Sequence, residues 1–172
     1  MEIKSLETKN ELHDALWVNK LAWKEAYRDL LPEGFIEGMP IEPPNEQVEE
    51  VFDTIGGDDE VFLIAVDDTN TINGYIYLRW GSETKDFVGK TEAGLKEIYV
   101  HPDYWGQGIG TALLNDALEM VPSSIEAVRL EMLSGNKAAH EFYLARDFKI
   151  DGKSEFPIAG ESYPTDIYVC PL

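Results

Sequence analysis

Residues 101 to 114 read HPDYWGQGIGTALL and place glycine at alternate positions directly before a helical pattern. The glycines are Gly106, Gly108 and Gly110, and the run TALLNDAL that follows is typical of the first turns of a helix. A helix N-terminus carries unpaired backbone N–H groups and partial positive charge. Because glycine lets an anion approach those groups closely, a strand, a glycine loop and a helix together predict a phosphate-binding site.

The glycine spacing distinguishes between the known phosphate-binding loops. A P-loop needs the complete pattern G-x-x-x-x-G-K followed by Ser or Thr, which this sequence does not contain. A dinucleotide fingerprint needs G-x-G-x-x-G, and its third glycine falls on Thr111 or Leu113, according to which glycine is taken first. A nucleotide-binding α/β protein of another lineage therefore stays an alternative, but a weakened one.

The length and composition predict one soluble globular domain over residues 1–172. No apolar run approaches the roughly 20 residues that cross a bilayer, and the first ten residues lack the apolar core of a signal peptide. Cys170 is the one cysteine, so neither an intrachain disulfide nor a cysteine-based metal site can form, and we expect no metal. These features favour a cytoplasmic location and no membrane partner.

The charge is strongly acidic, with 33 acidic against 14 basic residues and a formal net charge of −19. Sequence-independent nucleic-acid binding relies on clustered Lys and Arg, and no such cluster occurs, so we expect no nucleic-acid partner. Two interpretations of the acidity stay open. A cationic partner or substrate is one, and adaptation to a high-salt cytoplasm is the other. The even spread of the charge favours the second.

The periodicity of apolar residues predicts helices in the first third of the chain and a sheet beyond it. Thr8 or Asn10 is expected to cap the first helix, and Pro32 to end it. The expected helices cover residues 11–31, 33–39, 47–55, 109–120 and 137–147. The expected strands cover residues 3–7, 61–66, 71–80, 94–100, 126–133, 148–156 and 161–170. The chain is therefore predicted to form one mixed α/β domain.

The pattern V-x-P-x-Y-x-G-x-G-I-G-x-x-L-L, after a strand ending in IYV, resembles the acyl-CoA loop of the GNAT superfamily of N-acetyltransferases. The resemblance implies a central, mostly antiparallel sheet of six to seven strands, with a splayed coenzyme strand, flanking helices and acetyl-CoA as co-substrate. It implies that the main chain of Ile98, Tyr99 and Val100 pairs with the pantetheine arm. It also implies that backbone amides hold the coenzyme pyrophosphate, at Trp105, Gly106, Gln107, Gly108, Ile109, Gly110 and Thr111. The family has Arg or Gln at the position of Trp105, so a side-chain contact to the phosphates is in doubt there.

A second segment, N-x-x-A-x-x-F-Y followed by Phe148, resembles the last conserved segment of the same family. The resemblance implies that Asn136 contacts the coenzyme arm and that Tyr143 protonates the departing thiolate as general acid. Asn136 and Tyr143 are seven residues apart, so they share one helix face. A phenol suits the acid role because its pKa of about 10 keeps it protonated at neutral pH. Asp147 stands where the family has glycine, which predicts a weaker helix C-cap.

The general base is less well marked. Many members of the family place a Glu six residues before the position of Val100, which is Gly94 here. Glu97 and His101 are the alternative bases, and for both a structural or solvent-facing role is also open. A nucleophilic cysteine is not required when the amine attacks the thioester directly, so Cys170 is interpreted as structural.

For the acceptor, the resemblance implies a small-molecule or peptide amine. It places Trp23, Tyr27 and Tyr75 in the wall of the acceptor pocket, although core packing is the alternative for each. Homodimerisation is left open. The leading hypothesis is an acetyl-CoA-dependent N-acetyltransferase. A catalytically silent acyl-CoA-binding sensor or scaffold is the alternative from a different class.

Overall fold

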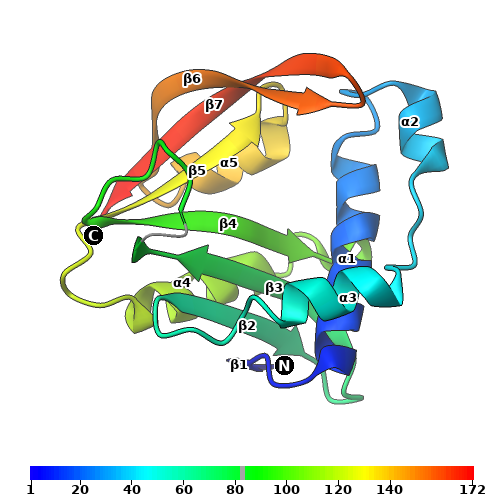
Figure 1. Cartoon of the computed structure of the whole chain (residues 1–172), viewed down its shortest axis with the longest axis horizontal. Helices are drawn as coiled ribbons and strands as arrows, with labels where there is room; N and C mark the ends of the chain where they lie inside the picture. Colours follow the sequence, from blue (N-terminus) through cyan, green and yellow to red (C-terminus); the bar gives the residue numbers. More distant parts are fainter. Residues whose placement is uncertain (82–83) are drawn as a thin grey trace.

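The computed structural model describes residues 1–81 and 84–172. One seven-stranded sheet runs through the molecule in the order β1-β2-β3-β4-β5-β7-β6 (Figure 1). All neighbouring pairs are antiparallel except β4 and β5, which are parallel. The strands are β1 (Glu2–Ser5), β2 (Glu60–Val66), β3 (Ile72–Arg79), β4 (Glu92–Val100), β5 (Ala127–Leu133), β6 (Lys149–Ile158) and β7 (Glu161–Pro171). The expected fold class, a mostly antiparallel sheet with flanking helices, is confirmed.

Helices cover both faces of the sheet. Successive residues of a strand point to opposite faces, so one strand can pack against helices on both sides. On β2, Leu63 packs in the cluster that contains α4, whereas the adjacent Ile64 packs in the cluster that contains α1. In the part of the chain that the structure describes, no helix is long and apolar enough to cross a membrane. The helices are α1 (Lys9–Ala26), α2 (Glu33–Gly38), α3 (Asn45–Phe52), α4 (Ile109–Met120) and α5 (Lys137–Leu144).

The first helix begins as predicted and ends earlier than predicted. Thr8 is its N-cap and forms a capping box with Glu11, so the choice between the two candidate caps is settled. The expectation that Pro32 ends this helix is wrong, since α1 stops at Ala26. The chain then turns, with the backbone N–H of Leu31 donating to the Tyr27 carbonyl at 3.1 Å. This turn buries the side chains of Tyr27 and Leu31 in a cluster with residues of α2, β5 and β6.

A β-bulge in β4 decides which of its side chains face which side of the sheet. Tyr77 of β3 lies opposite Glu97, and the next residue, Leu78, lies opposite Leu95, so Lys96 is the extra residue. Leu95 and Ile98 therefore both pack in the cluster with α4 although they are three positions apart. As a consequence, Glu97 is turned to the opposite face, the side covered by α1.

The parallel pair β4 and β5 stays together over only part of its length. The pairing covers Glu92–Gly94 of β4 and Ala127–Arg129 of β5, whereas β4 continues to Val100 and β5 to Leu133. Figure 1 shows the two strands diverging toward the end of the sheet where α1 lies. The backbone of β4 between Leu95 and Val100 is therefore not paired with β5. The splay expected for the coenzyme strand is present.

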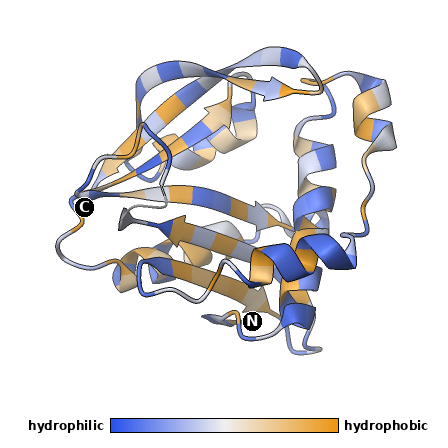
Figure 2. Ribbon diagram, viewed as in Figure 1, coloured by the Kyte–Doolittle hydropathy of each residue, from blue (hydrophilic) through white to orange (hydrophobic). Residues whose placement is uncertain are grey.

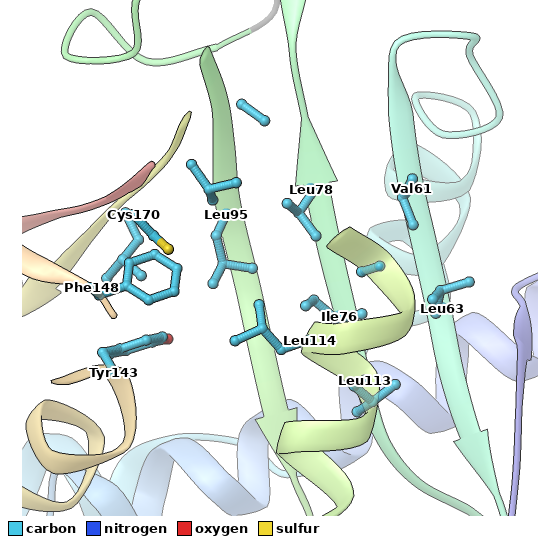
Figure 3. Close-up of a cluster of buried hydrophobic side chains, with 14 of the residues drawn as sticks. Val61, Leu63, Ile76, Leu78, Leu95, Leu113, Leu114, Tyr143, Phe148 and Cys170 are labelled. Atoms are coloured by element: carbon cyan, nitrogen blue, oxygen red, sulfur yellow. The ribbon is translucent and has the colours of Figure 1, made fainter. Parts of the chain in front are cut away.

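The main core lies between the sheet and helices α4 and α5, and Figure 3 shows part of it. Leu113, Leu114, Ile76 and Leu78 are fully or almost fully buried there. β2 and β3 carry long hydrophobic runs, whereas the edge strand β6 is largely hydrophilic and exposed (Figure 2). Cys170 is buried in this same core, which agrees with the structural role expected for it.

The close approach of α4 to β3 depends on Gly74. A Cβ at this position would lie 3.0 Å from the Tyr99 carbonyl oxygen and 3.2 Å from Leu113 Cδ1. Because the first contact is backbone, Gly74→Ala is expected to lower the free energy of unfolding by about 1–3 kcal/mol. Urea unfolding measures this. Gly34→Ala is the matched control, since no atom lies within 4 Å of its Cβ position on α2, and a loss as large as that of Gly74→Ala would contradict the steric explanation.

Candidate active site

A cavity of about 730 Å³ opens where β4 and β5 diverge. Residues 95–100 of β4 and 130–132 of β5 form its sides, and the glycine loop with the start of α4 forms one end. Residues of α5 and the last turn of α1 complete the wall. The cavity is large enough for a cofactor-sized ligand. The glycine loop, the end of β4 and the segment from Asn136 to Tyr143 therefore meet at one place.

The glycine loop presents bare backbone to this cavity. Gly106 and Gly108 have φ of 76° and 83°, a left-handed conformation that favours glycine, and Gly108 is the N-cap of α4. Among residues 1–81 and 84–172, no atom lies within 4 Å of a Cβ built at either position, so the space in front of the loop is open. Within the described residues no side chain caps α4, and its first turn contains no acidic residue, so its N-terminal amides are left for a ligand.

Gly110 serves packing rather than open space. A Cβ at this position would lie 3.3 Å from Cε2 of Phe142 on α5 and 3.7 Å from Cγ2 of Val100 on β4. The third glycine therefore lets α5 and the end of β4 approach the first turn of α4 closely. The three glycines therefore serve two purposes: Gly106 and Gly108 leave open space before the α4 N-terminus, and Gly110 allows close packing.

The side chains of Trp105 and Gln107 are held by the loop itself. The Trp105 indole Nε1 donates to the Val100 carbonyl at 2.7 Å, and 44% of the residue is exposed. The Gln107 amide donates to the Asp103 carbonyl at 3.3 Å. Trp105 thus pins the loop to the last residue of β4 and has no further side-chain donor to offer an anion. The departure from the family pattern is real, and it leaves the loop with backbone donors at this point.

Asn136 and Tyr143 both line the cavity from α5, seven residues apart. Asn136 caps the helix, because its side chain accepts from the backbone N–H of Ala139 at 3.2 Å. Tyr143 is 7% exposed, and its ring packs 5.4 Å from that of Phe148, beside which it lies in Figure 3. Its hydroxyl makes no hydrogen bond within residues 1–81 and 84–172, so the donor is available to a ligand. Burial raises the pKa of Tyr143 well above the usual value.

Asp147 takes over the conformation that glycine provides in the family. Its φ is 63°, in the left-handed region, and the Phe148 N–H after it donates to the Tyr143 carbonyl at 3.2 Å. Aspartate tolerates this region better than most residues do. The end of α5 is therefore closed in spite of the substitution, at the cost of some backbone strain.

Two further phenols, Tyr27 and Tyr99, line the cavity with Tyr143. Burial raises the pKa of Tyr99 well above the usual value, and the nearby groups that add to this include Tyr27, Glu97 and Tyr143. Burial also raises the pKa of Tyr27, an effect that the neighbouring Asn136 side chain opposes. The cavity is therefore lined by neutral O–H donors. The sequence identified Tyr99 for its main chain only, because the bulge that orients its side chain cannot be read from the residues.

Glu97 also lines the cavity, and its carboxylate is held from behind. The Tyr75 hydroxyl donates to Glu97 Oε2 at 2.5 Å, and the Asn19 amide of α1 donates to that hydroxyl at 2.8 Å. Burial raises the pKa of Tyr75 far above the usual value, so this phenol is a neutral donor. The side chains of Asn19, Tyr75 and Glu97 form a hydrogen-bonded row that ends at the cavity.

Of the three residues expected in the acceptor wall, only Tyr27 lines the cavity. Tyr75 is completely buried between the sheet and α1, behind Glu97, because the β3 face that carries it packs against α1. Trp23 packs against Tyr27 and Phe35, with ring centroids 4.6 Å and 6.1 Å away, and supports the wall from outside. Core packing, the alternative interpretation of Trp23 and Tyr75, describes their positions.

The other candidate bases lie outside the cavity. His101 caps a 3-10 turn, Pro102–Tyr104, by accepting from the Asp103 N–H at 3.2 Å, and its ring lies tilted against that of Trp17 with centroids 5.6 Å apart. Gly94, where many family members have Glu, lies within the paired part of β4, and a Cβ there would be 3.3 Å from Val88 Cγ2. Glu97 is thus the one of these three positions that reaches the cavity.

Charged side chains of both signs line the cavity. Glu25 and Asp29 come from the end of α1 and the turn after it, and Arg146 follows α5. None of the three was identified as a site residue from the sequence. Glu25 and Asp29 carried a usable signal, since they flank Tyr27 in the segment that was already expected to line the acceptor pocket. Arg146 carried none, because its meaning depends on what surrounds it in space.

The fold and the cavity define a class, a mixed α/β protein with a ligand-sized cavity at a splayed parallel strand pair. The family model described as the acetyltransferase (GNAT) family matches residues 20–148. The chain therefore belongs to the GNAT family, as the sequence predicted.

Curated relatives match parts of the chain. A peptidyl-lysine N-acetyltransferase, YjaB of Salmonella typhimurium, is 33% identical over 82 residues, which cover 48% of this chain and 54% of that protein. The uncharacterized N-acetyltransferase MJ1207 of Methanocaldococcus jannaschii is 42% identical over 59 residues, which cover 33% of this chain and 26% of that protein. The chain thus spans about half the length, or less, of these relatives.

Solved structures share the fold over the whole chain. The PaiA N-acetyltransferase of Thermoplasma acidophilum in complex with coenzyme A superposes with a TM-score of 0.72 at 24% identity, covering 99% of this chain and 98% of that one. A ribosomal-protein-alanine N-acetyltransferase of Brucella melitensis gives a TM-score of 0.72 at 17% identity, with complete coverage of both chains. At these identities the likeness establishes the fold alone.

Proposed function

We propose that this chain is an N-acetyltransferase that moves an acetyl group from acetyl-CoA to a primary amine. The observation that carries the proposal is the cavity at the β4–β5 splay. It joins an uncapped helix N-terminus behind a glycine loop to the buried phenol of Tyr143 and the carboxylate of Glu97. Residues 1–172 are proposed to act as one acyltransferase domain.

The residues present fit coenzyme A. The amides of the glycine loop and of the first turn of α4 would hold the pyrophosphate, since the open space before Gly106 and Gly108 admits an anion. The main chain of Ile98 to Val100, which has no strand partner on the β5 side, would pair with the pantetheine arm. Asn136 lines the same wall and would contact that arm. The coenzyme supplies an acetyl thioester, which is activated toward attack by an amine.

The residues of the chain supply proton transfer and positioning. Holding both reactants in one cavity replaces a bimolecular encounter, so no acyl-enzyme intermediate is needed. Glu97 is proposed to take a proton from the acceptor ammonium, directly or through water, and the row behind it keeps its carboxylate in place. Tyr143 is proposed to donate its proton to the leaving thiolate, because its hydroxyl has no other partner among the described residues and its raised pKa keeps it protonated.

The acceptor is proposed to be a primary amine that arrives as a cation. Asp29 adds negative charge to the wall on the α1 side, near Tyr27, and Glu25 lines the same side with its carboxylate paired to Arg28. Negative charge in a cleft raises the local concentration of cationic substrates. A small-molecule amine or a peptide amine fits this chemistry, and the peptidyl-lysine activity in the name of one relative belongs to the second type.

Free-thiol release from acetyl-CoA tests the proposal. The full chain is assayed at low and high salt against a panel of small amines, amino acids, peptide N-termini and lysine peptides. We expect release with one amine class and no release without an acceptor. Calorimetry with acetyl-CoA accompanies the assay. Binding without release across the panel would support the silent acyl-CoA-binding module instead, and the absence of binding would contradict both.

A further inference from the structure

Arg146 differs from the other arginines in its ion pairing. Within the described residues, Arg28, Arg79 and Arg129 each have a carboxylate oxygen within 4.0 Å. Arg146 has none among the same residues, although the chain carries 33 acidic residues and a net charge of −19. Burial lowers its pKa, and no carboxylate acts in the opposite direction. A partly buried guanidinium without an anionic partner is costly unless a ligand supplies the anion.

The contacts of Arg146 place its charge at the glycine loop. One terminal nitrogen donates to the hydroxyl of Thr111, the third residue of α4, and the other donates to the Phe142 carbonyl at 2.6 Å. The guanidinium carbon lies 3.8 Å from the centroid of the Phe142 ring, so the group is stacked and fixed in orientation. Arg146 lines the same cavity as Gly106, Gly108 and Gly110.

This position is electrostatically unfavourable in the absence of a ligand. The first turn of α4 carries the partial positive charge of the helix, and a cation beside it is repelled. The C-terminal carbonyl of α5 offsets part of that repulsion through the bond from Arg146 to Phe142. The Nε of Arg146 remains buried without a hydrogen-bond partner. An anion bound at the α4 amides would lie within the reach of both positive groups and would remove the conflict between them.

We propose that Arg146 supplies the side-chain positive charge for the coenzyme pyrophosphate in this chain. It would replace, from the end of α5, the Arg or Gln that the family has at the position of Trp105, whose own donor is bound to Val100. The inference rests on the proposed function, since it concerns the same coenzyme site. It assigns Arg146 a binding role toward phosphate and no part in proton transfer.

Calorimetry with three ligands tests this assignment on the full chain. Coenzyme A carries the pyrophosphate and a 3′-phosphate, dephospho-coenzyme A carries the pyrophosphate alone, and pantetheine carries neither. Arg146→Gln is expected to weaken both nucleotide ligands equally, by about ten- to hundredfold, since a hydrogen bond to a charged group is lost. Pantetheine should bind Arg146→Gln and the wild type alike. Arg146→Lys should recover part of the affinity, because it keeps the charge and loses the bidentate fork.

Lys149→Gln is the matched control, because it removes one positive charge from the exposed strand β6, away from the cavity. Its affinities should stay within about twofold of the wild type, as expected for a distant, screened charge. An equal loss of affinity for pantetheine would mean that Arg146 holds the fold of the site and does not bind phosphate, and it would overturn the proposal. A loss confined to coenzyme A would move the contact to the 3′-phosphate and overturn it as well, and unchanged affinity for all three would do the same.

Thermal unfolding of each variant shows whether the fold is kept. If Arg146→Gln does not fold, Arg146→Met decides, because methionine keeps an unbranched stem and removes the charge. Equal binding of both nucleotide ligands to that variant and to the wild type would then overturn the proposal. Failure of the wild type itself to bind coenzyme A would defeat the proposed function, whereas binding that is insensitive to Arg146 would defeat only this assignment.

Discussion

Tyr143→Phe is expected to lower kcat by about 10²- to 10³-fold and to leave the affinity for acetyl-CoA within about twofold of the wild type. The phenol reaches the cavity with a hydroxyl that has no hydrogen-bond partner among the residues the structure describes, and the ring is part of the core beside Phe148 and Tyr168. Phenylalanine keeps that packing and removes only the proton donor. Stopped-flow thiol release under saturating substrates measures kcat, and calorimetry measures the affinity.

The pKa of Tyr143 adds a second readout. Burial raises it, so the phenol is protonated at every pH below about 10, the ordinary value for tyrosine. Loss of the Tyr143 proton should therefore contribute no alkaline decrease in kcat up to that pH in the wild type. A decrease below pH 9 that Tyr143→Phe abolished would contradict the protonated phenol.

Tyr168→Phe is the matched control for this prediction. The ring of Tyr168 lies 5.7 Å from that of Tyr143 in the same core, and its hydroxyl is bonded to His140 Nδ1 at 2.8 Å, outside the cavity. The kcat of Tyr168→Phe should stay within about threefold of the wild type, because Tyr168 donates no proton to the reaction. Similar losses in both variants would indicate that the core, and not the phenol of Tyr143, sets the rate.

The sequence predicted most successfully where the chemistry is local. The glycine loop, the helix after it and the Asn136–Tyr143 spacing lie within short contiguous segments, and the structure brings them to one cavity. Backbone requirements explain this success, since a left-handed φ at Gly106 and Gly108 depends on the residues themselves. The capping box of Thr8 and Glu11 is local in the same sense.

The failures have a common cause in tertiary contacts. α1 ends at Ala26, and the turn that follows buries Tyr27 and Leu31 against segments distant in the sequence. The bulge at Lys96 changes which β4 side chains reach the cavity, and nothing in GLKEIYV marks it. Arg146 resembles any arginine at a helix end until its lack of a carboxylate among the described residues becomes visible. Strand register and ion pairs depend on residues far apart in the sequence, so the periodicity of residues does not predict them.

Glu97→Gln is expected to lower kcat by about 10²-fold at neutral pH, with a change in KM of less than about threefold. Glutamine keeps the size of the side chain and can still accept from the Tyr75 hydroxyl through its carbonyl, so the row from Asn19 is preserved. What is lost is the group that takes the proton from the acceptor. Measurement of kcat and KM separately, from thiol release at varied amine concentration, distinguishes proton transfer from binding.

The pH dependence sharpens this prediction. A lysine-type amine has a pKa of about 10.4, so the fraction already neutral in solution rises about tenfold for each pH unit below that value. A variant without a base depends on this fraction, and its deficit should shrink to less than about tenfold at pH 9, since free neutral amine replaces the missing proton transfer. A deficit that stayed constant from pH 7 to pH 9 would contradict a base role for Glu97.

Glu25→Gln separates this base role from simple attraction of a cation. Glu25 lines the same cavity from α1, and its removal changes the net charge by the same amount as the removal of Glu97. If the carboxylates only concentrate a cationic acceptor, both variants should raise KM by similar factors, should keep kcat, and should lose their difference from the wild type in high salt. If Glu97 takes the proton, only its variant loses kcat, and salt does not restore it. The base role therefore predicts a loss of kcat in Glu97→Gln and none in Glu25→Gln. A uniformly acidic surface cannot produce that difference.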